Sequence, residues 1–247
     1  KDAGSSVLGS AEASGINRAQ EAVENAINSP LLNDKDVDGA KKSISSGSNV
    51  EWVEEESYFF RLSKWQDKLI EFYSKNPNFI LPETRKNEVI SFVKSGLKDL
   101  SVSRKSFNWG IKVPSNKEHV IYVWLDALTN YLSALNYPNE SDNLYKSFWP
   151  ADLHLIGKDI LRFHAIYWPA FLLAADIKPP KRVFGHGWIL SGDEKMSKSK
   201  GNILDPLEII DNYGLDPLRY YLIKEVSFGN DGNISQEKLE LCINSDL

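Results

Sequence analysis

Three lysines lie within six residues of a polar loop, at Lys195, Lys198 and Lys200. Serine and glycine surround them over residues 191–202, so the loop offers hydroxyl and backbone donors beside its ammonium groups. Lysine ammoniums are compact point charges that suit phosphate groups. A lysine-rich loop is usually only a solvated turn, so this pattern by itself permits polyphosphate binding and does not require it.

A second group of candidate residues begins at Gly157, directly after a short apolar run. Glycine lets a ligand approach the backbone, and Asp159 can accept hydrogen bonds from an ammonium group or from ribose hydroxyls. Ile160, His164 and Trp168 follow at four-residue spacing, which places them on one face of a helix. The alternative is a histidine with satisfied hydrogen bonds in the core.

The elements that must position these residues alternate between strand and helix. Apolar runs over 119–125, 152–157 and 182–190 predict buried strands, and Asp126 is a plausible cap for the helix after the first of them. This order favours an α/β fold with a parallel sheet, in which ligands bind beyond the carboxyl ends of the strands. Trp124 and Tyr131 would then stand at the first strand end, although a large aromatic there is more often simple core. The apolar spacing predicts helices over residues 53–75, 83–98, 159–175 and 206–213.

The first 49 residues differ in composition from the rest of the chain. All 28 aromatic residues lie after residue 49, and a polar stretch over 43–49 has the character of a linker. Apolar residues over 19–27 recur at helical spacing before Pro30. Residues 9–15 could be read as a phosphate loop, but no lysine follows at P-loop spacing, so a plain turn is favoured.

Composition bounds the class of protein. The 247 residues are 42% hydrophobic and 26% charged, which excludes a fibrous or fully disordered chain. A net charge of −5 argues against a broadly basic nucleic-acid-coating surface, although local phosphate contact stays open. A single cysteine, Cys242, fits a reducing cytoplasmic location, and the lack of any 18-residue apolar stretch predicts no membrane contact. The chain begins at Lys1 and its only methionine is Met196, so we expect a fragment.

Two resemblances add to these readings. Residues 3–42 resemble the start of the C-terminal domain of the bacterial cell-division GTPase FtsZ, but without that family's nucleotide-binding loops. The word Lys195-Met196-Ser197-Lys198-Ser199 (KMSKS) after a strand resembles the second signature of class I aminoacyl-tRNA synthetases. The words VEWVEEESYFFRLSKW, YVWLDALTNY, DLHLIGKDILRFHAIYWPAF and GHGWILSGDEKMSKSKGN are similar to the methionyl-tRNA synthetase family over about residues 50–247.

The second resemblance implies a ligase. Methionine would be activated by ATP, accompanied by Mg²⁺, to methionyl-adenylate and then transferred to the acceptor end of tRNA(Met). The aromatic rings would suit a thioether, which makes favourable contacts with aromatic side chains. By this resemblance, Trp124, Tyr131, His164, Trp168 and Asp159 would bind methionine, Gly157, Asp159, His186, Gly187 and Lys198 would bind ATP, and Lys195 and Lys198 would be catalytic.

The same resemblance predicts an incomplete enzyme. The HIGH signature and the first half of the nucleotide-binding fold are absent, so we expect little activity from the chain alone. The zinc-binding knuckle of the connective insertion is also absent, so we expect no metal site. The expected divisions are an FtsZ-like helical segment and linker (1–49), the end of the connective insertion (50–115), the second half of the Rossmann-like parallel sheet (116–205) and a helical stem (206–247). The alternatives are an FtsZ-related interaction segment contacting FtsZ polymer through residues 1–46, or a chimera of two genes joined near residue 47.

Overall fold

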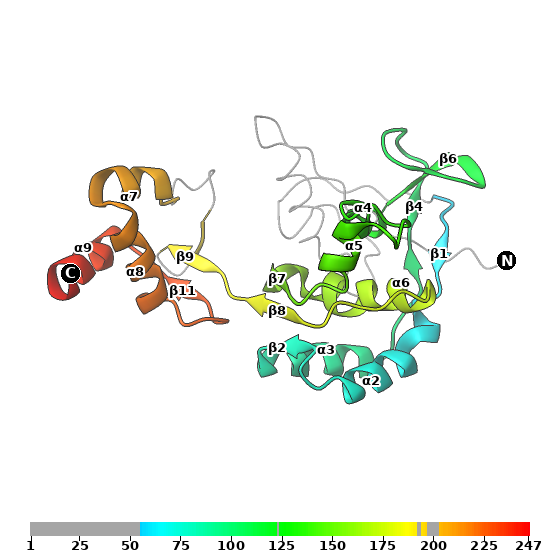
Figure 1. Cartoon of the computed structure of the whole chain (residues 1–247), viewed down its shortest axis with the longest axis horizontal. Helices are drawn as coiled ribbons and strands as arrows, with labels where there is room; N and C mark the ends of the chain where they lie inside the picture. The colour runs from blue at the N-terminus through cyan, green and yellow to red at the C-terminus, as the bar shows by residue number, and fades with distance from the viewer. Residues whose placement is uncertain (1–54, 123, 192–193, 197–202) are drawn as a thin grey trace, which may run out of the picture. The chain divides into compact units, whose positions relative to one another are not determined.

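The computed structural model describes residues 55–122, 124–191, 194–196 and 203–247 (Figure 1). They belong to two compact units: described residues 55–60 and 101–122 lie in one, and Arg61–Leu100 with the described residues between Trp124 and Leu247 lie in the other. The predicted helix over 19–27, the linker over 43–49 and the FtsZ-like segment lie outside the described residues.

The first unit contains an antiparallel three-stranded sheet, β4-β6-β5. Its central strand is β6 (Asn116–Ile121), and Val113 of β5 (Lys112–Val113) pairs with Asn116 across a two-residue turn. A two-residue connection can join only antiparallel strands. The prediction that residues 119–125 form a strand of the parallel sheet is therefore wrong: this strand ends at Ile121, and Ser103 of β4 (Ser103–Arg104) pairs with Ile121 on its other side.

The predicted helix over 53–75 is wrong in its first half. Residues 57–60 run extended instead, because the amide of Tyr58 donates to Ser103 Oγ at 2.8 Å and its carbonyl accepts from Val102 N at 2.8 Å. These long-range bonds outweigh the local apolar spacing. The segment continues as strand β1 (Phe59–Phe60), 3₁₀ helix η2 (Leu62–Trp65) and helix α2 (Gln66–Lys75), and β3 (Leu100–Ser101) comes after the next helix.

The second unit contains the parallel sheet that the strand and helix alternation predicts. Its order is β2-β8-β7, and both neighbouring pairs are parallel. The strand β7 (His154–Gly157) matches the predicted run over 152–157, whereas β2 (Ile80–Leu81) was not predicted, because two residues carry no periodic signal. His154 and Ile156 alternate inward from β7 with Leu155 outward, as one covered sheet face requires. The helix α3 (Glu83–Lys94), predicted over 83–98, lies beside β2 in Figure 1 and buries Val89 and Val93.

The helical stretch predicted over 159–175 is present but is not one regular helix. It comprises 3₁₀ helix η3 (Lys158–Ile160), π-helix η4 (Phe163–Tyr167) and helix α6 (Trp168–Ala174). Pro169 has no amide hydrogen to donate to the carbonyl of Ala165, and the Tyr73 hydroxyl donates to that carbonyl instead, at 2.6 Å. The widened turn before this proline contains Phe163 and His164, and both side chains are buried.

The apolar run over 182–190 is two strands in two sheets. The strand β8 (Val183–His186) belongs to the parallel sheet, and β9 (Ile189–Ser191) lies between β10 (Glu194–Lys195) and β11 (Gly232–Asn233). The change of partners falls at Gly187 and Trp188. Sequence alone joins the two strands because both are apolar and only two residues separate them.

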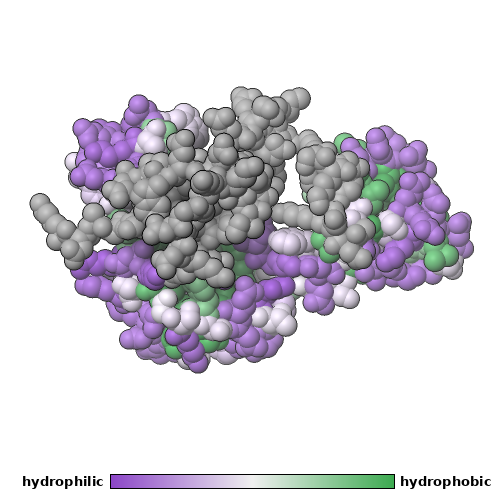
Figure 2. Space-filling model, turned by 180° about the vertical axis from the view of Figure 1, so that it is seen from behind, coloured by the Kyte–Doolittle hydropathy of each residue, from purple (hydrophilic) through white to green (hydrophobic). Residues whose placement is uncertain are grey.

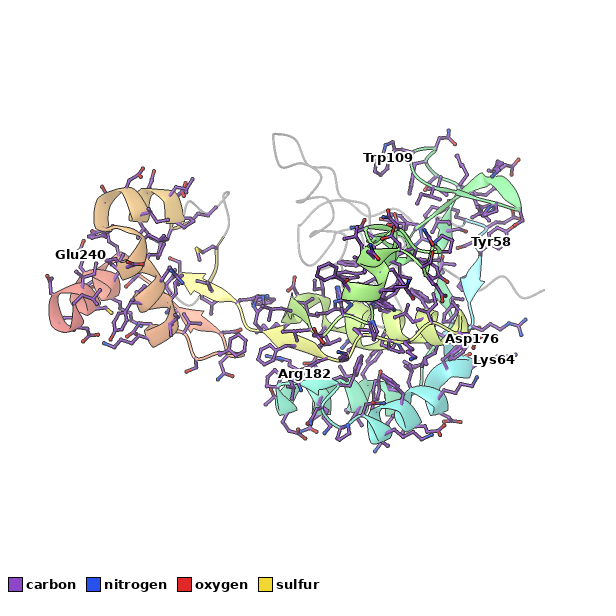
Figure 3. The ribbon with its side chains drawn as sticks, viewed as in Figure 1. Tyr58, Lys64, Trp109, Asp176, Arg182 and Glu240 are labelled. Carbon is purple, nitrogen blue, oxygen red and sulfur yellow. The ribbon has the colours of Figure 1, made fainter. Side chains whose placement is uncertain are left out.

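The C-terminal helices form a small core around Tyr221, Leu239 and Cys242, against which Met196 packs. The helix α7 (Pro206–Tyr213) matches its predicted range, and Asp205 caps it by accepting from Leu207 N at 2.8 Å. Helices α8 (Leu215–Glu225) and α9 (Gln236–Asp246) follow. Glu240 of α9, labelled in Figure 3, accepts a hydrogen bond from the Tyr213 hydroxyl. Ile223 of α8 and Leu241 of α9 are exposed apolar side chains. Figure 2 shows patches of hydrophobic residues on the C-terminal helices.

Helices α4 (Leu125–Ser133) and α5 (Asn143–Phe148) complete the second unit. The prediction that Asp126 caps α4 is wrong. The helix begins at Leu125, directly after Trp124, so Asp126 lies within its first turn. Among the described helices, none has the length and apolarity to cross a bilayer.

Candidate active site

Trp124, the first residue of the candidate site, has an unusual backbone conformation. Its φ angle is +66°, in the left-handed region that a bulky residue rarely adopts, which costs about 1–3 kcal/mol. This conformation turns the chain directly into α4. The indole stacks on the ring of Phe163, with centroids 4.4 Å apart, and meets His164 edge-on at 6.0 Å.

Tyr131, His164 and the carbonyl of Ile160 form a chain of hydrogen bonds. The carbonyl at its end determines which atoms carry the protons. His164 Nδ1 lies 3.0 Å from the carbonyl oxygen of Ile160, and a carbonyl only accepts, so Nδ1 donates. Burial lowers the pKa of His164, although the bond to Ile160 opposes the shift. The neutral ring therefore presents the Nε2 lone pair, and the Tyr131 hydroxyl donates to it at 2.9 Å. The oxygen of Tyr131 keeps its lone pairs for another donor.

His154 supports Tyr131 from the other side. Its ring stacks on that of Tyr131 with centroids 4.2 Å apart and an interplanar angle of 26°. The side chain is buried, and burial, with a smaller contribution from His164, lowers the pKa of His154 to about 4. Its Nε2 has no hydrogen-bond partner among the described residues. Because the His154 ring stays neutral, no buried positive charge lies against the ring of Tyr131.

The structure thus brings together the four aromatic residues predicted for methionine. Trp168, only 2% exposed, contacts Tyr131 at 6.2 Å between centroids. Sequence reasoning missed Phe163 and His154. Phe163 could have been found because it is adjacent to His164, and His154 because it lies at an inward-facing position of a predicted strand. We call the following six residues the aromatic cluster: Trp124, Tyr131, His154, Phe163, His164 and Trp168.

Asp159 is an exposed carboxylate beside the end of β7. Its Oδ1 accepts a long bond of 3.4 Å from Trp188 Nε1, and no described residue forms an ion pair with it. A Cβ atom at Gly157 would lie 2.5 Å from Asp159 Oδ1, so any other residue here would push this exposed carboxylate aside. The glycine therefore leaves the carboxylate room, as well as leaving the backbone accessible.

The other predicted adenosine contacts lie at the end of β8. His186 is exposed, and its Nδ1 donates to the carbonyl oxygen of Gly187 at 2.7 Å. A Cβ atom at Gly187 would lie 2.1 Å from the carbonyl carbon and oxygen of Asn230. The close approach of the backbone at residues 230–231 is therefore enough to require glycine at position 187, whether or not a ligand binds there.

The two catalytic lysines predicted from the sequence are only partly covered by the structure. Lys195 ends β10, whose residue Glu194 pairs with Ser191 of β9. Lys198 and Lys200 lie outside the described residues. Within the described part of the chain, no group of three or more His, Cys, Asp and Glu side chains could hold a metal ion.

Comparisons with known proteins agree on one family. The model of the family "tRNA synthetases class I (M)" matches residues 13–247, which includes most of the FtsZ-like segment. The chain is 64% identical over 202 residues to the methionine–tRNA ligase of Rickettsia felis and 57% identical over 225 residues to methionine–tRNA ligase 1 of Bacillus anthracis. These alignments cover 82% and 91% of the chain but only 39% and 34% of the two relatives. These matches do not support the FtsZ likeness, which stays a prediction.

A solved structure gives the same result. The crystal structure of Mycobacterium tuberculosis methionyl-tRNA synthetase bound by methionyl-adenylate is 55% identical and superposes with a TM-score of 0.78. The match covers 85% of this chain and 41% of that one. The chain therefore spans about two fifths or less of the length of the relatives reported above.

Proposed function

Because this chain belongs to the class I tRNA synthetases of the methionine type, we propose that it carries the amino-acid-binding part and the lysine loop of a methionine–tRNA ligase. The proposed reaction joins methionine to ATP as methionyl-adenylate and then transfers the methionyl group to the acceptor end of tRNA(Met). The relative solved with methionyl-adenylate supports this choice of intermediate. The chain covers too little of its relatives for the whole reaction to be assigned to it alone.

The aromatic cluster is the observation that carries the proposal. Its rings and Tyr131 hydroxyl offer an apolar, polarisable environment with one polar group, which suits the thioether of methionine. The hydroxyl is held by His164, so its remaining lone pairs and its direction are fixed. A branched aliphatic side chain would gain less from such rings, because it has no polarisable sulfur.

Asp159 supplies the charge that an amino-acid substrate requires. Its carboxylate is exposed and forms no ion pair with a described residue, so it is available to the α-ammonium group or to ribose hydroxyls. Adenosine would lie along Gly157, His186 and Gly187, at the carboxyl ends of the parallel strands.

The lysine loop would act on the phosphates. The methionine carboxylate attacks the α-phosphorus of ATP, the bond to the bridging oxygen breaks, and pyrophosphate leaves with the electron pair. Lys198, assisted by Lys195, would stabilise the charge that grows on pyrophosphate, and the loss of one such group costs about 3–4 kcal/mol. The attacking carboxylate is already ionised, so no general base is needed.

Magnesium would accompany ATP in this reaction. Among the described residues, no group of three or more His, Cys, Asp and Glu side chains could hold it, so no residue is assigned to it. The free, buried thiol of Cys242 is compatible with the cytoplasmic location that we propose for this activity.

Binding of a stable adenylate mimic tests this function directly. Isothermal titration of the chain with 5′-O-(N-methionyl)sulfamoyl-adenosine should show one saturable site, weakened by Trp124→Ala and by Lys198→Ala. Lys198→Ala should leave the melting temperature unchanged, and the exposed Lys178→Ala is the matched control for both measurements. ATP–pyrophosphate exchange by the chain alone should be at background. Equal affinity for the valyl and methionyl mimics would contradict the proposed methionine site.

A further inference from the structure

The carbonyl of Ala165 lies in the middle of the π-helix η4 and accepts a hydrogen bond from outside that helix. In a regular α-helix its donor would be the amide four residues further along, but residue 169 is proline and has no amide hydrogen. The Tyr73 hydroxyl of α2 donates to this carbonyl instead, at 2.6 Å. Ala165 is fully buried, so solvent could not replace Tyr73 as the donor without a change in the packing around it.

Tyr73 is well placed to be a fixed donor. The residue is only 3% exposed, and its ring stacks on that of Phe79 with centroids 6.1 Å apart and an interplanar angle of 15°. Burial raises the pKa of the Tyr73 hydroxyl far above its ordinary value, so the group stays protonated at neutral pH. The bond therefore joins two buried groups that are 92 residues apart in sequence.

The helix that accepts this bond also carries residues of the aromatic cluster. Phe163 and His164 directly precede Ala165 in η4, and His164 Nε2 accepts from the Tyr131 hydroxyl at 2.9 Å. The amide of Trp168 donates to the carbonyl of Phe163, five residues back, which is the bond that widens the turn. A shift of the η4 backbone would therefore move several rings of the aromatic cluster together.

Helix α3 contacts the same segment one residue before η4. The Arg162 guanidinium lies 4.1 Å from the centroid of the Phe92 ring on α3. Helices α2 and α3 pack on each other and lie side by side in Figure 1. The pair thus contacts this segment at two points, and the contact from Tyr73 is the one that reaches the backbone inside η4.

We propose that Tyr73 is a positioning residue for the amino-acid site, whose hydroxyl fixes the backbone of η4 and so holds Phe163 and His164 in place for the side chain of methionine. A site that is held in its binding geometry before the ligand arrives loses less free energy on binding. This inference rests on the proposed function, in which the aromatic cluster binds methionine. It gives α2 a role in amino-acid selection, although Tyr73 is not a member of the aromatic cluster.

Tyr73→Phe tests this role, because it removes the hydroxyl and keeps the ring that stacks on Phe79. The variant is titrated with the methionyl sulfamoyl-adenosine mimic and with the glycyl mimic, which has the same ammonium and adenosine groups but no side chain. Tyr73→Phe should raise the dissociation constant of the methionyl mimic about two- to tenfold, the range of one net hydrogen bond, and leave that of the glycyl mimic unchanged. The preference for the methionyl mimic should therefore fall by the same factor.

Tyr221→Phe is the matched control, because it removes another buried hydroxyl in the same unit. Tyr221 is 2% exposed, and its hydroxyl donates to the carbonyl of Ser235 at 3.2 Å and accepts from the Ser235 amide at 3.1 Å. Both variants should have lower midpoints in urea denaturation than the wild type. Only Tyr73→Phe should change the preference between the two mimics.

The outcomes separate this inference from the function on which it rests. Equal weakening of both mimics by Tyr73→Phe, loss of its cooperative urea transition, or an unchanged preference for the methionyl mimic would each overturn the inference and make Tyr73 a purely structural residue. A wild-type chain that binds both mimics equally, or binds neither, would instead contradict the proposed methionine site.

Discussion

His154 should make the stability of this chain fall as the pH drops below neutrality. The ring is buried against Tyr131, and burial lowers its pKa to about 4 from an unfolded value near 6.5. Between these two values the unfolded chain binds a proton that the folded chain does not. The stabilising contribution of the neutral ring is therefore complete above about pH 6.5 and is lost as the pH falls through 4.

The size of the effect follows from the two pKa values. With 6.5 in the unfolded chain and about 4 in the folded chain, lowering the pH from about 7 to about 5 costs about 2 kcal/mol of unfolding free energy through this one group. His154→Phe keeps an aromatic ring to stack on Tyr131 and loses no hydrogen bond formed by Nε2 with a described residue. The variant should be less sensitive to acid by about the same 2 kcal/mol.

Urea denaturation followed by circular dichroism at several pH values measures this difference. The wild-type chain should lose about 2 kcal/mol more than His154→Phe between pH 7 and pH 5. His186→Asn changes an exposed histidine and is the control, which should keep the wild-type slope. Parallel pH curves for the wild type and His154→Phe would refute the argument that burial keeps this ring neutral.

Two further predictions follow from the same region. Tyr131→Phe removes the hydroxyl that donates to buried His164 Nε2, and should lower the unfolding free energy by about 1–3 kcal/mol in urea denaturation at neutral pH. Gly187→Ala forces a methyl group to within 2.1 Å of the Asn230 backbone, and should lower stability by about 1–3 kcal/mol in thermal denaturation, with no ligand present.

Each of these changes has a matched control. Tyr145→Phe removes a hydroxyl from a half-exposed tyrosine on α5 and should cost less than about 0.5 kcal/mol. Gly185→Ala places a methyl group 3.4 Å from the flexible Leu161 side chain, where small adjustments suffice, so it should be tolerated better than Gly187→Ala. If the variant and its control lost equal amounts of unfolding free energy, the named contact would not be the cause of the destabilisation, and that prediction would be wrong.

The sequence predicted most of the regular elements of the parallel-sheet unit. Apolar runs located β7 and β8, and helical spacing located α3 and α7, because each of these segments buries one face locally. The same reasoning failed for residues 57–60, where bonds to Val102 and Ser103 hold an extended chain. It also joined β8 to β9, because strand membership depends on which distant segment supplies the hydrogen bonds.

For the candidate site, the sequence by itself determined the chemical types: the aromatic residues, the carboxylate of Asp159 and the lysines of the loop. Only the tertiary structure decided their surroundings. The proton position on His164 depends on the Ile160 carbonyl, the neutral state of His154 depends on burial, and the partner of Lys158 is Asp231, 73 residues away. Side-chain chemistry is local to a residue, whereas desolvation and pairing depend on what the fold places beside it.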